Sequence, residues 1–197
     1  ELYTRYSKEI QPFRQVHRMI DWFESLIKTH TVVILAEYVQ YNKFSENAKL
    51  LLTQGLFTPT LGIWRRIGQD LFRELEEQET FSWTVPAFRE EYQILLKALE
   101  KNDTNVIELR NFYAHGATPE DEVCKKHIRQ IEPFLHQLIQ LKWLEQSSTI
   151  VKDGLVYLES THRELCLHPV LLYRKENSGS PLAFFNDLKN DKVGLLN

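Results

Sequence analysis

The residues with the clearest chemical potential lie in the middle of the chain, between Leu109 and Gly116. There an arginine, Arg110, precedes an asparagine, Asn111, and a histidine, His115, follows four residues later. An arginine can stabilise the negative charge of a phosphate, and a histidine can transfer a proton near neutral pH. These residue types therefore point to a site that could bind and cleave a phosphodiester.

A helix over residues 106–115 would place three polar side chains of this segment on one face. Because each residue of a helix turns by about 100°, Asn111 and His115 lie roughly 40° apart and Glu108 lies roughly 20° from His115. In this polar stripe the amide or the carboxylate could orient the imidazole. Arg110 would lie roughly 140° from His115. The two could meet one ligand only if the arginine reaches around the helix, or if a second copy of the chain supplies one of them.

The same residues also fit a purely structural interpretation. A histidine in the last turn can cap helix carbonyls just before a glycine such as Gly116, while Arg110 remains solvated. The arginine-to-histidine spacing recurs between Arg163 and His168, where no asparagine follows the arginine. Spacing alone leaves both interpretations open.

The segment Arg110-Asn111-Phe112-Tyr113-Ala114-His115 resembles the Arg-Asn-x-x-x-His signature of the HEPN superfamily. Members of that superfamily are bundles of four or more helices, with the motif before or at the final helix. The resemblance covers about residues 1–145 and implies a metal-independent endoribonuclease, often a toxin or effector in bacterial stress or antiviral defence, with its site formed across a homodimer. It implies that the arginine contacts phosphate and that the histidine helps the ribose 2′-hydroxyl attack. Asn111 would position a group, and Glu108 matches an acidic residue sometimes found just upstream.

Two features of the resemblance limit the expected function. Toxins paired with nucleotidyltransferase antitoxins carry a tyrosine two residues after the histidine, whereas this chain has Ala117, so control by that modification is not expected. Many members of the superfamily have also lost catalysis. The alternative is therefore a non-catalytic domain that dimerises, or that binds a nucleotide or another protein.

Three further residues are candidate RNA contacts. Arg65 and Arg66 follow Trp64 and could line an RNA groove through phosphate contacts and stacking. The alternative places the tryptophan in the core and the two arginines on a solvated face. Tyr113 could flank the site, or it could be a packed helix aromatic.

Composition argues against several other classes of protein. Lys and Arg number 24 against 27 Asp and Glu, so any nucleic-acid binding must rest on a local patch. The histidines lack metal-ligand spacing, the two cysteines are far apart, and no glycine-rich phosphate loop is present, so we expect no metal and no cofactor. No apolar run could span a bilayer. We expect a cytoplasmic protein without a membrane partner.

Apolar spacing predicts a mainly α fold, a HEPN-like helical bundle with a small C-terminal antiparallel β element. Helices are expected at 11–41, 45–53, 59–77, 88–101, 106–115 and 119–145, the third capped by Thr58 and the last kinked at Pro133. Strands are expected at 149–151 and 155–158, joined at Asp153-Gly154, and at 170–174, 182–185 and 193–196. The expected domains are 1–145 and 146–197, the second a β-rich appendage, within a piece of a longer polypeptide.

Overall fold

The computed structural model describes residues 2–41, 45–55, 60–100, 106–139, 142–152, 155–161, 163–167, 171–175, 181–187 and 192–196. Their helices are α1 (Leu2–Ser7), α2 (Pro12–Tyr41), α3 (Glu46–Gly55), α4 (Leu61–Glu76), α5 (Pro86–Glu100), α6 (Val106–Ala114), α7 (Asp121–Ile139) and α8 (Lys142–Glu145). Their strands are β1 (Ser148–Lys152), β2 (Leu155–Glu159), β3 (Glu164–Cys166), β4 (Leu171–Lys175), β5 (Pro181–Asp187) and β6 (Lys192–Leu196). The predicted mainly α fold with a small C-terminal antiparallel β element is confirmed.

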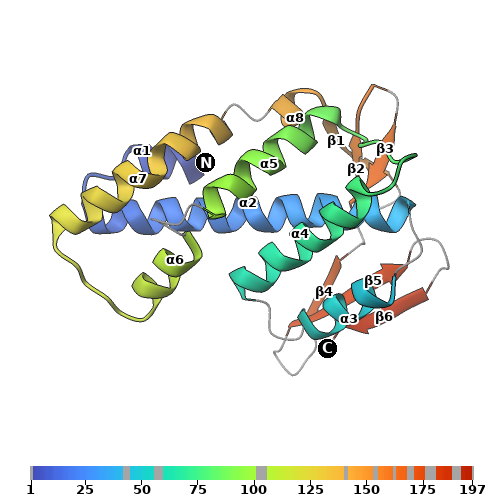
Figure 1. Ribbon diagram of the computed structural model, residues 1–197, viewed down its shortest axis with the longest axis horizontal. Helices are drawn as coiled ribbons and strands as arrows, with labels where there is room; N and C mark the ends of the chain where they lie inside the picture. The colour runs from blue at the N-terminus through green and yellow to red at the C-terminus, as the bar shows by residue number, and fades with distance from the viewer. Residues whose placement is uncertain are drawn as a thin grey trace.

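Helix α2 is the axis along which α1, α4, α6 and α7 pack, as Figure 1 shows. Its 30 residues contain no glycine or proline after the first position, which permits one uninterrupted helix. Contacts with α1, α4, α6 and α7 cover it, so residues on several of its sides are buried. Among them are Phe23 and Ile34, each 0% exposed. A central helix covered in this way fixes the positions of the helices around it.

Helix α4 packs on α2 through the apolar face that the sequence predicts. Trp64 is 4% exposed, which confirms its expected place in the core, and Ile67 and Leu71 are fully buried. The helix begins at Leu61, later than predicted, because the hydroxyl of Thr60 accepts a hydrogen bond from the backbone N–H of Ile63 at 3.3 Å and caps the first turn. The predicted cap, Thr58, lies outside the described residues.

Helix α7 also begins later than predicted, at Asp121. The carbonyl of Glu120 accepts from the backbone N–H groups of Val123 and Cys124, at 3.0 and 3.2 Å, so the first turn forms after the expected start at Pro119. The helix continues through Pro133 to Ile139.

The first β-sheet has the order β1-β2-β3 and is antiparallel. Lys152 pairs with Leu155, which confirms a hairpin with a two-residue connection, although residues 153 and 154 themselves lie outside the described part of the chain. Strand β3 was not predicted. Leu158 and Leu165, 2% and 0% exposed, join the core of the helices. The division of the chain at residue 145 stays a prediction.

The second sheet has the order β4-β5-β6, again with antiparallel neighbours. Its three strands agree with those expected near residues 170, 182 and 193.

Candidate functional site

The motif lies on α6, a short helix held by one buried face. Val106, Leu109 and Tyr113 are 1%, 7% and 3% exposed, at helical positions i, i+3 and i+7. The helix ends as the sequence predicts: Gly116 has φ of 82°, in the left-handed region that favours glycine, and its N–H donates to the carbonyl of Tyr113 at 3.2 Å. This geometry sets the direction of the residues on the other face.

The other face of α6 carries the predicted polar stripe. Glu108, Asn111 and His115 are all exposed to solvent. The His115 backbone N–H donates to the carbonyl of Asn111 at 3.1 Å, so the helical ladder extends to the histidine. No hydrogen bond of the His115 imidazole occurs within the part of the chain that the structure describes, so the ring is not used to cap carbonyls there. It is accessible to a ligand.

Arg110 is only half-exposed, and its guanidinium turns toward the stripe. One of its Nη1 N–H groups donates to the Oδ1 atom of Asn111 at 3.3 Å. The arginine thus reaches part of the way around the helix, toward the face that holds His115. The structure brings Arg110 and Asn111 together. Whether Arg110 and His115 of one chain share a ligand stays a prediction.

Phe112 belongs to the same exposed face, although the motif suggested no role for it. Its side chain is 47% exposed, high for a large aromatic residue. It lies four residues after Glu108 and three before His115, so helical periodicity alone could have placed it in the stripe. Its ring lies 5.3 Å from the ring of Tyr113 and 6.3 Å from the ring of His127, and the rest of it faces solvent.

Tyr113 lies under the stripe rather than in it. Its hydroxyl lies 3.1 Å from Nδ1 of His127 and 3.4 Å from Sγ of Cys124, both on α7. Burial and the contact with Cys124 raise the pKa of Tyr113, while burial and the nearby Lys126 lower the pKa of His127. The burial of Tyr113 fits the alternative of a packed helix aromatic.

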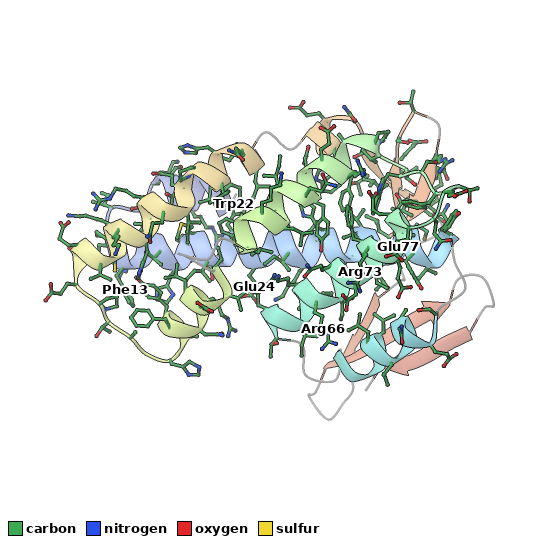
Figure 2. The ribbon with its side chains drawn as sticks, viewed as in Figure 1. Phe13, Trp22, Glu24, Arg66, Arg73 and Glu77 are labelled. Carbon is green, nitrogen blue, oxygen red and sulfur yellow. The ribbon has the colours of Figure 1, made fainter. Side chains whose placement is uncertain are left out.

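Two partly buried residues of α2 complete the cluster around Tyr113. The ring of Phe13 lies 5.8 Å from the ring of Tyr113, and the ring of His17 lies 5.4 Å from it. Figure 2 labels Phe13, which lies in the first turn of α2, at the end of that helix nearest α6. The tyrosine therefore ties α6 to both α2 and α7. Sequence reasoning missed this cluster because its members come from three separate segments.

The predicted RNA contacts Arg65 and Arg66 lie on α4. Arg66 is exposed, with its Nε 3.6 Å from a carboxylate oxygen of Asp70. It lines a hollow of about 410 Å³ with residues of α3 and α4, including Arg73 (Figure 2). The described lining of this hollow includes no residue of α6. Binding of RNA by these arginines stays a prediction.

Within the described ranges, no group of three or more His, Cys, Asp or Glu side chains is arranged to hold a metal ion. No helix in that part of the chain is long and apolar enough to cross a membrane.

Comparison of the chain with protein-family models, curated proteins and solved structures found no match. The chemistry of the α6 stripe must therefore be argued from its own residues.

Proposed function

We propose that this chain is a cytoplasmic, metal-independent endoribonuclease of the HEPN type, with Arg110 and His115 as its catalytic residues. The observation that supports the proposal best is the exposed stripe of α6. Its imidazole, which has no hydrogen bond to any described residue, follows an arginine already turned toward the same face. The expected biological role is that of an effector in bacterial stress or antiviral defence.

In the proposed reaction the imidazole of His115 takes the proton of a ribose 2′-hydroxyl. The 2′-oxygen then attacks the adjacent phosphorus, and the bond from phosphorus to the 5′-oxygen breaks. The leaving 5′-oxygen takes up a proton from water and the imidazolium of His115 returns its proton to the solvent, so the products are a 2′,3′-cyclic phosphate and a 5′-hydroxyl end. The guanidinium of Arg110 stabilises the charge that develops on the phosphate oxygens.

A homodimer would resolve the angular separation of the two catalytic side chains. Arg110 and His115 point in directions roughly 140° apart on an ideal helix, so one chain presents them together only at the limit of the arginine's reach. Two copies that place their α6 stripes against one cleft could each supply one of the two groups. Asn111 would then hold the guanidinium through the 3.3 Å bond already present.

The test compares the wild type with Arg110→Ala and His115→Ala on a panel of structured RNAs in buffer with a chelator. Each variant should lose activity by a factor on the order of 10² or more, with an unchanged melting temperature because neither side chain belongs to the core. Arg129→Ala and His136→Ala are matched controls, since both residues are exposed on α7 and neither precedes an asparagine or lies in the stripe. The proposal fails if the wild type cleaves no RNA, or if His115→Ala cleaves as fast as the wild type.

One observation favours the alternative, a non-catalytic dimerisation or interaction domain. Phe112 leaves 47% of its surface exposed in the middle of the stripe, and Val123 at the start of α7 leaves 39%. A contiguous exposed apolar patch marks an interaction site, so an interface of two copies that joins these side chains would bury such a patch. A chain that dimerises through Phe112 and cleaves no RNA would support this alternative.

A further inference from the structure

A second cavity of about 340 Å³ lies far from α6 in the sequence, where three segments meet. Its walls are the C-terminal end of α2, the link between α4 and α5, and the first residue of β3 with the residue before it. This volume is at the lower end of the range in which small molecules are bound. Any ligand would therefore be small.

A carboxyl group forms one polar wall of the cavity. Glu37 is 5% exposed, and its Oε1 and Oε2 atoms accept hydrogen bonds from the N–H and the hydroxyl of Thr84, at 2.7 and 3.1 Å. These bonds fix the orientation of the carboxyl group. Each carboxylate oxygen can accept a further bond, so the group retains acceptor capacity toward the cavity.

A guanidinium group forms a second polar wall. Nη1 of Arg163 donates to the carbonyl of Ser82 at 2.8 Å, which places the side chain across the cavity edge. A guanidinium has five N–H donors, so others remain for a ligand. The second carboxylate at the cavity, Glu164, is paired with Lys152. With Glu37 ionised, the negative charges of Glu37 and Glu164 are balanced by the positive charges of Arg163 and Lys152. The cavity then has no net charge, which favours a neutral ligand.

Two aromatic rings supply the apolar part of the lining. The rings of Tyr41 and Phe81 have centroids 5.1 Å apart and meet edge to face. Phe81 also meets the ring of Trp83 edge to face, with centroids 4.9 Å apart, so its position in the aromatic wall is fixed. A planar molecule can pack against such a wall. The cavity thus combines a hydrogen-bond acceptor, a donor and an aromatic surface.

We propose that this cavity binds a neutral, planar nitrogen heterocycle that carries an N–H donor next to an acceptor, the class to which nucleobases belong. Glu37 accepts from the ligand's donor, Arg163 donates to its acceptor, and Phe81 packs against its ring. The proposal is independent of catalysis by α6, since it uses none of the same residues.

Ligand binding at this cavity is coupled to proton release. Burial raises the pKa of Glu37 to about 7, against the opposing effects of the Thr84 bonds and of Arg163. A ligand N–H that donates to the carboxyl group favours its ionised form. The other charged or titratable groups at the cavity are Glu164 with its partner Lys152, and Tyr41. Affinity should therefore increase between pH 6 and pH 8 as Glu37 ionises.

The test is isothermal titration calorimetry of the full chain with adenosine, guanosine, cytidine and uridine. At least one nucleoside should bind the wild type, more tightly at pH 8 than at pH 6. Glu37→Gln and Arg163→Ala should each weaken that binding about tenfold or more, the loss expected for one hydrogen bond to a charged group. Glu37→Gln should also abolish the dependence on pH.

Thermal melting checks that each variant is folded, and Arg129→Ala, at an exposed position of α7, is the control that should bind as the wild type does. The proposal is overturned if none of the four nucleosides binds, or if folded Glu37→Gln and Arg163→Ala bind them with wild-type affinity. Cleavage of RNA by α6 can fail or succeed without changing either result.

Discussion

His30 and Glu37 lie seven residues apart on α2, and burial shifts their pKa values in opposite directions. His30 is fully buried with a pKa lowered to about 4, and Glu37 is 5% exposed with a pKa raised to about 7. Nδ1 of His30 lies 2.8 Å from the carbonyl of Leu26, an arrangement that requires Nδ1 to carry the proton. Nε2 has no partner in the described structure, so a second proton would leave an unpaired buried charge.

The two titrations should nearly cancel in the pH dependence of stability. His30 has a folded pKa below its ordinary 6.5. Its contribution to the free energy of unfolding is therefore complete above pH 6.5 and is lost as the pH falls toward 4. Glu37 has a folded pKa above its ordinary 4.5. Its contribution to the free energy of unfolding is therefore complete below pH 4.5 and is lost as the pH rises through 7. Each shift corresponds to about 3 kcal/mol. Between pH 4.5 and 6.5 these two effects have opposite signs.

Single variants should expose each titration. In Glu37→Gln the free energy of unfolding should increase more steeply from pH 4.5 to 6.5 than in the wild type, because only the histidine effect remains. In His30→Gln it should decrease relative to the wild type over the same range. Urea unfolding at pH 4.5, 5.5 and 6.5 measures these slopes, and all other groups titrate alike in the three proteins. Equal slopes in all three proteins would contradict the assignment of shifted pKa values to His30 and Glu37.

Tyr113→Phe should destabilise the chain by about 1 kcal/mol, because it removes the hydroxyl and leaves polar atoms of α7 without that partner. Urea unfolding at pH 7 measures the loss. A double-mutant cycle with His127→Leu supplies the control: if the 3.1 Å contact carries the effect, the tyrosine change should cost less in that background. Strictly additive losses would show that the hydroxyl acts through other neighbours.

Local patterns predicted much of this fold, and long-range contacts account for what they missed. The apolar spacing of α2 and α4 and the glycine after α6 follow from local rules, so these elements were expected close to where they lie. The polar stripe followed from helical geometry in the same way. No local pattern predicts the cavity at Glu37, because Arg163 meets the segment between α4 and α5 only after the chain has folded. The short strand β3 depends likewise on its pairing with β2.

Gly68→Ala should destabilise the protein, although alanine is the better helix former by about 1 kcal/mol. A Cβ atom at this position would lie 2.5 Å from the hydroxyl oxygen of Tyr92 and 2.7 Å from Oγ1 of Thr31. Neither neighbour can yield easily, since Tyr92 is 2% exposed and the threonine donates to the carbonyl of Trp64 at 3.1 Å. We expect a net loss of about 1–3 kcal/mol, as for other overpacked cores.

Gly62→Ala is the matched control on the same helix. There the nearest atom to a new Cβ is Oγ1 of Thr60 at 3.9 Å, an ordinary contact. This variant should be neutral, or more stable by up to about 1 kcal/mol. Thermal and urea unfolding of both variants test the comparison, and a Gly68→Ala protein as stable as Gly62→Ala would contradict the close approach of α4 to α2.

Gly116 gives a way to move His115 without changing any proposed catalytic side chain. Its φ is 82°, and a Cβ atom added there would meet no described atom within 4 Å, so the cost of a substitution comes from the backbone alone. Gly116→Ala should therefore cost about 1–2 kcal/mol, whereas asparagine tolerates the left-handed region and should cost less. Urea unfolding measures both values.

The same pair of variants links the end of α6 to the proposed activity. A strained residue 116 should loosen the last turn, in which the N–H of His115 donates to the carbonyl of Asn111. If the imidazole acts in RNA cleavage, Gly116→Ala should slow cleavage more than Gly116→Asn under conditions in which both are folded, since a displaced catalytic group reduces the rate. Equal rates in the two variants, together with the expected difference in stability, would show that the position of the helix end does not control the reaction.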